Sequence, residues 1–535
     1  MPEQHLLSGH VGTIGGVVAL NAQRTPDRVA LIASSGDRRL SYVELDRRST
    51  RLAHGLLGLR ASSGERITVW LGDCFEYVEL YVAAAKGGLV VAPSNKRLSP
   101  DEVMFQIEHC ESKILVTDAA RYEMLRSVSP RIAAIATVLV GEHDLPGSER
   151  AHRFEDVVSQ GRGSALPAVS PAQPFIVGYT SGTTGRPKGA VLTHQAVMDA
   201  AFSELVSKRI GIYSTLAYSL SLSFVSSVTA LLFPHLVAGG TAVFCSDADP
   251  AETLDTIERH GANYVYTPSP HVGAYADLLA ARPKALTTLR SVVHSGSKVP
   301  ADTLCRLWES VGERLVEGWG MTETAGAGVT AYSWSDVSGS AVPPGLFESV
   351  GRPTVRCAVR VRPIAEQVDD ARSGELELSC PSLMTGYLND PDATAAALVD
   401  GWYRTGDIGY LDDEGLVHLT DRRTDLILSG GINVYPSEVE SVISGLPEVD
   451  AVGVVGVPHP RWGETVVAVV VGRPGARLAA DDVLDVCRRR LASYKKPARV
   501  VLSDALPYTA SRKLDRRALR SEIEDRARRE TWWDE

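Results

Sequence analysis

Short runs of β-branched and apolar residues alternate with helix-like segments along most of the chain. RITVWLG at residues 66–72 precedes CFEYVELYVAAAKGG at residues 74–88, and GGTAVF at residues 239–244 precedes PAETLDTIERHG at residues 250–261. A chain that switches in this way between strand-like and helix-like segments folds into layers of helices on sheets, so we predict an α/β fold. The pair Gly87-Gly88 predicts the end of a helix and the start of a buried strand.

The chain is longer than one hydrophobic core usually supports. With 535 residues it is expected to form at least two domains, one of them subdivided. The stretch from Leu145 to Pro174 is rich in proline, glycine and serine, and we interpret it as an internal loop. Beyond Asp421 the sequence changes to a compact pattern that predicts a small α+β domain.

Charge and cysteine content exclude several classes of protein. A net charge of -10 gives no general attraction for nucleic acid or an anionic membrane. The seven cysteines are scattered without zinc-type spacing, which favours reduced thiols packed as small apolar residues. The chain contains no run of about 18 apolar residues and begins without a basic leader before an apolar segment. We therefore expect a cytoplasmic protein with no membrane span and no nucleic-acid partner.

One segment combines glycine, serine and threonine in a way that suits a polyphosphate. In FIVGYTSGTTGRPKGAVLTH, residues 175–194, one strand-like run precedes the loop and another follows it. Glycines let backbone N–H groups approach phosphate oxygens, hydroxyls add donors, and a lysine supplies a mobile positive charge. These groups come from Thr180, Ser181, Gly182, Thr183, Thr184, Gly185, Lys188 and Gly189. Because a glycine follows Lys188, the loop is not a Walker A motif. Any few of these residues alone would fit a flexible turn equally well.

The string YTSGTTGRPKG, residues 179–189, resembles the signature of the adenylate-forming superfamily. That superfamily includes acyl-CoA synthetases, adenylation domains of peptide synthetases and beetle luciferases. The resemblance implies a large N-terminal domain at residues 1–423, with two α/β layered subdomains and a β-barrel-like subdomain. It further implies a small α+β C-terminal domain at residues 424–535 that swings about a hinge at Thr424. ATP, Mg2+ and coenzyme A are the cofactors that it implies.

The segment VEGWGMTETAG, residues 316–326, is similar to the one in which an aromatic side chain stacks on adenine. In that resemblance Trp319 is the aromatic residue, Thr322 contacts the phosphate and Glu323 holds magnesium. A hard cation prefers carboxylate and phosphate oxygens, which agrees with the role of Glu323. The resemblance also assigns Ser297, Glu317 and Gly318 to the nucleotide site. Taken alone, the segment would fit a packed turn before a solvated helix start.

Three later segments extend the resemblance. GWYRTGDIGYLDDEG carries Asp407, similar to the aspartate that binds both ribose hydroxyls, since a carboxylate can accept two hydrogen bonds at once. DRRTDLILSGGIN matches the hinge region, with Arg422 at a ribose contact and with Gly430 and Gly431 where the pantetheine arm enters. Lys513 falls on the lysine that stabilises the transition state of adenylation. Alone, these segments would fit turns and a surface cation.

The segment LAYSLSLSFVSSVTALLF, residues 216–233, corresponds to the acyl-binding region and departs from the family. Many CoA ligases carry an aromatic–His pair where this chain has Ser223 and Phe224, and amino-acid-activating relatives carry an aspartate where it has Val225. An ammonium group facing valine would be desolvated without a partner, so amino acids are disfavoured. We hypothesise a bulky apolar acid, aromatic or alicyclic, in a pocket that includes Ser223, Phe224, Val225, Ser295 and Gly320. A serine-rich strand that only satisfies its own hydroxyls is an equal alternative.

Two departures keep several functions open. Arg512 stands where the family has glycine before the catalytic lysine, and Thr424 stands where it generally has Asp or Lys. The predicted function is that of an AMP-forming acyl-CoA synthetase, an acid–thiol ligase that acts as a monomer or homodimer. The alternatives are loading of a carrier-protein phosphopantetheine, thioesterification from preformed acyl-AMP only, and a luciferase-like oxygenase.

Overall fold

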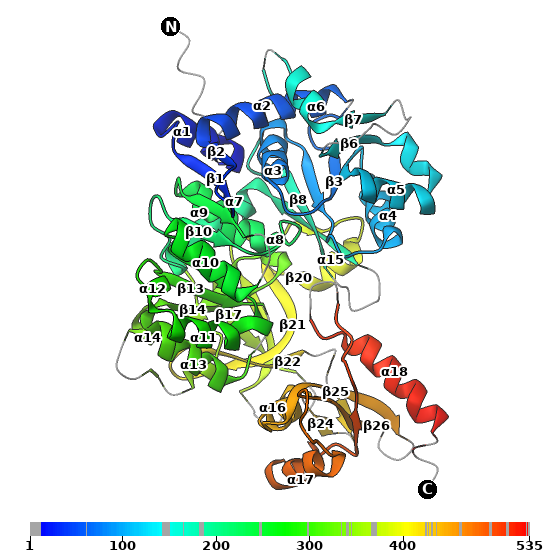
Figure 1. The fold of residues 1–535 in the computed structure, drawn as a ribbon. Helices are drawn as coiled ribbons and strands as arrows, with labels where there is room; N and C mark the ends of the chain where they lie inside the picture. The colour runs from blue at the N-terminus through cyan, green and yellow to red at the C-terminus, as the bar shows by residue number, and fades with distance from the viewer. Residues whose placement is uncertain are drawn as a thin grey trace. The chain divides into compact units, whose positions relative to one another are not determined.

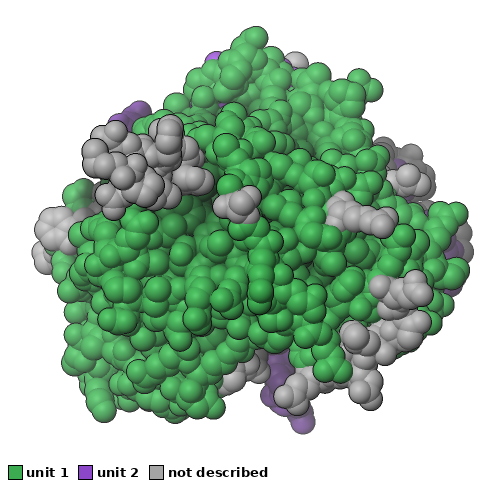
Figure 2. Space-filling view, turned by 90° about the horizontal axis from the view of Figure 1, so that it is seen from above, with its two compact units in different colours: residues 1–358, 379–403 green, residues 359–378, 404–535 purple. Residues whose placement is uncertain are grey.

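The chain forms two compact units, distinguished by colour in Figure 2. Unit 1 comprises Met1–Ala358 and Ser379–Tyr403, and unit 2 comprises Val359–Leu378 and Arg404–Glu535. The computed structural model describes residues 12–59, 61–141, 150–163, 165–180, 187–245, 249–296, 299–332, 334–338, 342–343, 345–364, 372–422, 425, 427–429, 432–434, 436–459, 463–491, 495–509, 513–530 and 532. The predicted domain boundary between residues 423 and 424 lies outside these residues and stays a prediction.

Unit 1 contains two large sheets whose central strands are parallel (Figure 1). The nine-stranded sheet consists, in spatial order, of β16 (Arg352–Pro353), β15 (Gly328–Ala331), β14 (Leu315–Gly320), β13 (Ser291–Ser295), β12 (Tyr264–Thr267), β10 (Thr215–Tyr218), β11 (Thr241–Phe244), β1 (Val29–Ala33) and β2 (Arg39–Ser41). The eight-stranded sheet consists of β19 (Gly386–Tyr387), β9 (Lys188–Thr193), β8 (Pro174–Thr180), β4 (Val90–Pro93), β3 (Arg66–Trp70), β5 (Ile114–Asp118), β6 (Ala136–Val140) and β7 (Ala151–Arg153). Parallel pairing of this kind requires crossover helices, which the alternating sequence pattern predicts.

The helices of unit 1 alternate with these strands along the chain. They are α1 (Ile14–Arg24), α2 (Tyr42–Gly58), α3 (Phe75–Gly87), α4 (Pro100–His109), α5 (Ala119–Val128), α6 (Phe154–Gln160), α7 (His194–Ser207), α8 (Val225–Ser227), α9 (Phe233–Val237), α10 (Pro250–His260), α11 (Val272–Ala281), α12 (Pro283–Leu286), α13 (Ala301–Val311), α14 (Trp334–Val337) and α15 (Pro391–Ala397). A capping box of Ser41 and Glu44 starts α2. The left-handed Gly88, with φ 67°, ends α3 just before the buried strand β4, as predicted.

The loop prediction for the stretch from Leu145 to Pro174 is wrong in part. Residues Ala151–Arg153 form β7 and Phe154–Gln160 form α6. The strand β7 pairs with β6, and Phe154, Val157 and Val158 are buried. Burial of these few apolar side chains against the sheet outweighs the flanking proline and glycine, because tertiary packing overrides local propensity.

Unit 2 contains the C-terminal sheet and most of a second sheet. The latter joins β17 (Ala358–Arg362), β18 (Gly374–Ser379), β21 (Trp402–Leu411) and β22 (Val417–Arg422), and β20 (Leu398–Val399) of unit 1 pairs with the first residues of β21. The C-terminal sheet joins β24 (Ile432–Val434), β23 (Ile427–Ser429), β26 (Gly463–Gly472), β25 (Val449–His459) and β27 (Arg499–Leu502). Its helices are α16 (Pro436–Ser444), α17 (Ala480–Arg490) and α18 (Arg516–Arg529).

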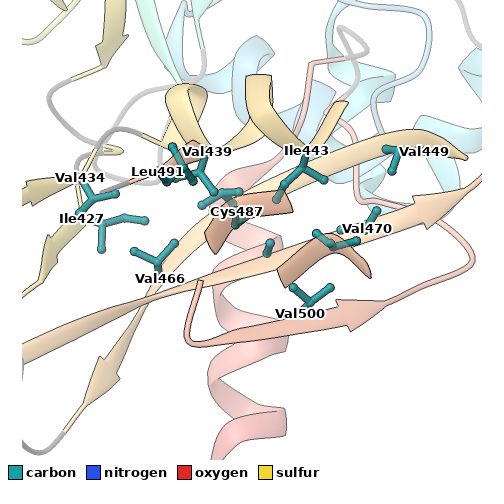
Figure 3. Packing of buried hydrophobic residues seen from close by; sticks show 13 residues of the cluster. Ile427, Val434, Val439, Ile443, Val449, Val466, Val470, Cys487, Leu491 and Val500 are labelled. Atoms are coloured by element: carbon teal, nitrogen blue, oxygen red, sulfur yellow. The ribbon is translucent and has the colours of Figure 1, made fainter. Parts of the chain in front are cut away.

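The C-terminal sheet carries its own hydrophobic core. Figure 3 shows Val439 and Ile443 of α16 and Cys487 of α17 beside side chains of the sheet such as Val466 and Val470. A separate cluster packs α18 against the same sheet through Leu519, Ile523 and Ala527. Because a unit with its own core can fold by itself, this part of the chain meets the physical requirement for a domain. None of the helices within the described residues is long and apolar enough to cross a membrane.

Candidate functional site

The antiparallel hairpin of β8 and β9 holds the ends of the predicted phosphate loop. Thr180, the last residue of β8, is paired with Lys188, the first residue of β9. The Thr180 hydroxyl donates to the Lys188 carbonyl at 3.4 Å. Lys188 is thereby fixed at the base of the loop. The predicted loop residues Ser181, Gly182, Thr183 and Thr184 lie outside the described residues.

Gly178 of β8 lies where three segments of the chain meet. A Cβ atom placed on Gly178 would lie 2.6 Å from Cγ2 of Thr322 and 2.6 Å from Cγ2 of Val225. The Thr229 hydroxyl also donates to the carbonyl of Ala325, which ties the acyl-binding segment to the turn after Glu323. The structure thus brings together the phosphate hairpin, the segment at residues 322–326 and the predicted acyl segment, which are far apart in the sequence.

This close packing makes Gly178→Ala a sharp test of the site. The added methyl group must displace Thr322 or Val225, and overpacking of this kind costs about 1–3 kcal/mol. We expect kcat/KM for ATP–pyrophosphate exchange to fall at least about tenfold. Gly58→Ala is the control, because a Cβ on Gly58 would meet nothing within 4 Å. Equal exchange rates for the two variants would contradict the packing argument.

Glu323 lies in a short 3-10 helix, Thr322–Thr324, directly after β14. The turn closes through Ala325, whose φ of 55° is left-handed. The Glu323 side chain is buried, its Oε1 atom accepts a hydrogen bond of 2.9 Å from the Tyr387 hydroxyl, and its carbonyl accepts one of 2.8 Å from the Met384 N–H. The carboxylate predicted to hold magnesium is therefore fixed by contacts from residues 384–387.

Tyr387 also contacts the predicted phosphate lysine. The Lys188 ammonium lies 5.2 Å from the centroid of the Tyr387 ring, within the range of a cation–π interaction. One side chain thus touches both the carboxylate of Glu323 and the cation of Lys188. Sequence analysis missed Tyr387, and no local spacing marks it, because strand pairing of β19 with β9 brings it to the site.

The strand β14 presents the predicted nucleotide residues. Trp319 is buried. The carboxylate of Glu317 is hydrogen-bonded to Nδ1 of His294 at 2.5 Å, and Nε2 of His294 lies 2.9 Å from the Ser269 hydroxyl oxygen. Burial raises the pKa of the Glu317 carboxyl, and the interaction with His294 offsets part of that rise. The Glu317 carboxylate is thus engaged inside the protein. Its predicted contact with the nucleotide stays a prediction, as does that of Trp319.

Gly318 and Gly320 have a packing role that the sequence did not reveal. A Cβ on Gly318 would lie 2.8 Å from the Thr330 carbonyl, and one on Gly320 would collide with the Ala327 carbonyl. Close approach of β14 and β15 therefore requires glycine at both positions. Their predicted roles toward nucleotide and substrate stay predictions, and Ser297 lies outside the described residues.

Several serines of the predicted acyl segment are hydrogen-bonded within the protein. The hydroxyls of Ser221 and Ser223 lie 2.9 Å apart, and Ser221 donates to Asp73 at 3.1 Å. The Ser227 hydroxyl donates to the Phe224 carbonyl at 2.9 Å. For these three serines the structure agrees with the alternative interpretation, in which the hydroxyls form hydrogen bonds within the protein.

The remaining predicted acyl residues differ in exposure. Val225 is buried, Phe224 is half-buried, and the Ser295 carbonyl accepts a hydrogen bond of 2.5 Å from the Tyr266 hydroxyl. The carboxylate of Asp73 is committed, since it also accepts from the Leu222 N–H at 2.6 Å and pairs with Lys96 at 2.8 Å. It is therefore not a substitute for the aspartate that amino-acid-activating relatives carry near this position.

Unit 2 holds the remaining predicted site residues. Asp407 of β21 is buried and is paired in register with Arg422 of β22. The two residues predicted to contact the ribose are therefore neighbours in backbone position across the strand pair. Lys513 is exposed, and its carbonyl accepts a hydrogen bond of 2.8 Å from the Thr509 N–H, which closes a turn. Thr424, Gly430, Gly431 and Arg512 lie outside the described residues.

Comparison with known protein families shows which family the chain belongs to. The family model described as "AMP-binding enzyme" matches residues 18–388. The chain belongs to this family. The model for the C-terminal domain of AMP-binding enzymes matches residues 438–513 as well. The predicted membership of the adenylate-forming superfamily is confirmed.

Relatives of this AMP-binding enzyme match it over nearly its whole length. A feruloyl-CoA synthase of Amycolatopsis sp is 33% identical over 508 residues, which are 94% of this chain and 97% of the relative. A 4-chlorobenzoate–CoA ligase of Arthrobacter sp is 32% identical over 524 residues, 94% of each chain. The solved o-succinylbenzoate CoA synthetase of Bacillus subtilis, in complex with its acyl-adenylate intermediate, has a TM-score of 0.81 at 28% identity and covers 94% of this chain and 97% of its own. The predicted α/β architecture with a large N-terminal and a small C-terminal domain is confirmed.

The donor set of this AMP-binding enzyme fits magnesium bound through a nucleotide. Within the described part of the chain, no group of three or more His, Cys, Asp or Glu side chains could hold a metal ion. Mg2+ commonly keeps several waters and takes one or two carboxylates plus substrate phosphates. Glu323, buried and held by Tyr387, supplies one such carboxylate next to the hairpin that carries Lys188.

Proposed function

We propose that this chain is an AMP-forming ligase that activates an aromatic or alicyclic carboxylic acid as an acyl-AMP and transfers the acyl group to coenzyme A. The observation that carries the proposal is the contact of Tyr387 with both Glu323 and Lys188. A carboxylate suited to Mg2+ accepts from the hydroxyl of Tyr387, and a cation suited to phosphate lies over the ring of the same side chain, at the base of the hairpin that resembles the family's phosphate loop. ATP, Mg2+ and coenzyme A are the cofactors of this activity.

In the first half-reaction a carboxylate oxygen of the acid attacks the α-phosphorus of ATP. A new O–P bond forms, the bond to the bridging oxygen breaks, and pyrophosphate leaves. Glu323 would hold Mg2+, which when bound would supply positive charge against the phosphates. Lys188 would attract the leaving pyrophosphate, Thr322 would donate to the α-phosphate and Lys513 would offset charge between the carboxylate and that phosphate. Asp407 and Arg422 would hold the ribose.

In the second half-reaction the thiol of coenzyme A replaces AMP. The sulfur attacks the acyl carbonyl carbon, the C–S bond forms, the C–O bond to AMP breaks, and the thiol proton passes to solvent. We propose that Gly430 and Gly431 admit the pantetheine arm and that a hinge at Thr424 exchanges Lys513 for these glycines. Two reactions in one pocket require such a change, because the catalytic groups of the two steps differ.

The substrate class follows from the residues around Val225. Asp73, the carboxylate that contacts this segment, pairs with Lys96 and accepts from the backbone of Leu222, so it is already engaged and does not replace an ammonium-binding aspartate. The half-buried Phe224 offers apolar surface next to the buried Val225, which favours a ring-bearing acid. The relatives named feruloyl-CoA synthase and 4-chlorobenzoate–CoA ligase act on aromatic acids, which supports the same class for this chain. We propose that the enzyme acts in the cytoplasm, as a monomer or homodimer.

A substrate panel tests this function. Aromatic and alicyclic acids, acetate and amino acids are each supplied with ATP and coenzyme A, and both pyrophosphate exchange and thioester formation are measured. We expect kcat/KM for the ring-bearing acids to exceed that for acetate at least about tenfold, since burial of a ring contributes about 1.5–3 kcal/mol. Amino acids should give background rates.

The panel also separates the alternatives. A strong preference for acetate or for amino acids would refute the substrate class. Exchange without thioester formation, but with transfer to a phosphopantetheine carrier protein, would favour carrier loading. Thioester formation from synthetic acyl-AMP without any exchange would favour a protein confined to the second half-reaction.

A further inference from the structure

Tyr387 is the side chain that connects Glu323 with Lys188, and the reaction scheme above gives it no role. We propose that Tyr387 is a positioning residue for adenylation: its hydroxyl orients the Glu323 carboxylate for a divalent cation, and its ring holds the Lys188 ammonium ready for the polyphosphate. This inference rests on the proposed function, because it assigns Glu323 to the cation and Lys188 to phosphate. It concerns residues of unit 1 alone.

The hydroxyl of Tyr387 is suited to orient a carboxylate. It donates to Oε1 of Glu323 at 2.9 Å, and Oε2 receives no hydrogen bond from any residue that the structure describes. A carboxylate fixed through one oxygen offers the other in a defined direction. Such outer-shell partners commonly tune the affinity of a ligand for its metal.

The ring of Tyr387 is suited to hold a cation that must later move. The Lys188 ammonium lies 5.2 Å from the ring centroid. A cation–π contact at a half-exposed site is weak compared with a pair of Lys and carboxylate, so a phosphate can displace it. The ring therefore holds the cation without neutralising its charge, because a tyrosine ring carries no net charge.

The backbone around Tyr387 holds the side chain in place. Tyr387 is paired with Ala190 of β9, and its N–H donates to the Thr394 hydroxyl at 2.8 Å. A Cβ on Gly386 would lie 2.7 Å from Cγ2 of Thr394, so the chain passes closely over α15. The Tyr387 hydroxyl also lies 3.4 Å from that of Tyr403. A positioning role requires such a fixed donor, because a mobile hydroxyl would orient nothing.

The hydroxyl is tested with Tyr387→Phe. Mn2+ is titrated by electron paramagnetic resonance into the full-length protein saturated with a non-hydrolysable ATP analogue. We expect the Kd for Mn2+ to rise about tenfold, as typical losses of outer-shell partners do, while affinity for the analogue in EDTA stays unchanged. The matched control is Tyr42→Phe, which removes a buried hydroxyl that donates to the Gly240 carbonyl at 2.7 Å. An unchanged Kd in Tyr387→Phe, or an equal rise in the control, would overturn the role of the hydroxyl.

The ring is tested with Tyr387→Leu, which removes the π surface as well. We expect affinity for the ATP analogue in EDTA to fall about threefold relative to Tyr387→Phe, as loss of an exposed cation–π contact implies. Equal affinity of the two variants would overturn the role of the ring. Wild-type protein that binds neither analogue nor Mn2+ would refute the proposed function itself, whereas normal binding by wild type and Tyr387→Phe alike would refute only this inference.

Discussion

Replacing Lys513 by alanine is expected to lower ATP–pyrophosphate exchange at least about a hundredfold, in the range seen when one preorganised charge or donor is removed from a transition state. The same variant should form thioester from synthetic acyl-AMP at close to the wild-type rate. The reason is that Lys513 is assigned to charge that develops only while the carboxylate attacks phosphorus. Isotope exchange and thioester formation, measured on one protein preparation, check the two halves separately.

The exposed position of Lys513 in a short turn makes this variant easy to interpret. The turn is closed by backbone atoms and by the Thr509 hydroxyl, which donates to the Lys513 carbonyl at 3.2 Å, so loss of the side chain leaves these bonds intact. Lys496→Ala serves as the control, since it removes another lysine of unit 2. Equal loss in both half-reactions, or loss in neither, would contradict the role given to Lys513.

Replacing Glu323 by glutamine is expected to reduce exchange by about two orders of magnitude at low Mg2+, with partial recovery as Mg2+ is raised. Glutamine retains an oxygen that can accept from Tyr387 and nearly the same volume, but it lacks the negative charge that a hard cation prefers. The side chain is buried, so bulk solvent does not replace the lost ligand. Exchange rates over a Mg2+ series measure the effect.

The Mg2+ dependence distinguishes a ligand from a structural residue. A structural defect would lower the rate equally at every Mg2+ concentration and would lower the melting temperature. Glu123→Gln provides a comparison, because Glu123 is exposed and, within the described part of the chain, pairs with the nearby Arg126 at 3.2 Å. If Glu323→Gln lost no activity at any Mg2+ concentration, Glu323 would not be a metal ligand.

The helices and strands that could be predicted from the sequence are those set by a local pattern of residues. Apolar runs such as RITVWLG became buried strands, and Gly88 ended α3 because only a residue tolerant of positive φ fits there. The loop predicted at residues 145–174 was wrong where β7 and α6 form, since their few apolar side chains acquire stability only by packing on a sheet built from distant segments. The local amino-acid composition does not encode that packing.

The predicted family is confirmed, whereas the roles of the predicted site residues stay predictions, and the sequence did not reveal the contacts between them. The motifs around Lys188 and Glu323 are short contiguous strings, so each can be recognised from neighbouring residues alone. The serines at residues 221–227 were ambiguous from sequence, since a hydroxyl can face a cavity or a neighbouring carbonyl. In the structure Ser221, Ser223 and Ser227 bond within the protein.

By itself the sequence determined the family, the order of the motifs and the identity of the charged groups, because each is encoded in a few neighbouring residues. Only the tertiary structure decided that Gly178 must remain small beside Thr322 and Val225, and that Tyr387 contacts both Glu323 and Lys188. These contacts join residues separated by up to about two hundred positions. Strand pairing and close packing create them, and both depend on how the whole chain is folded.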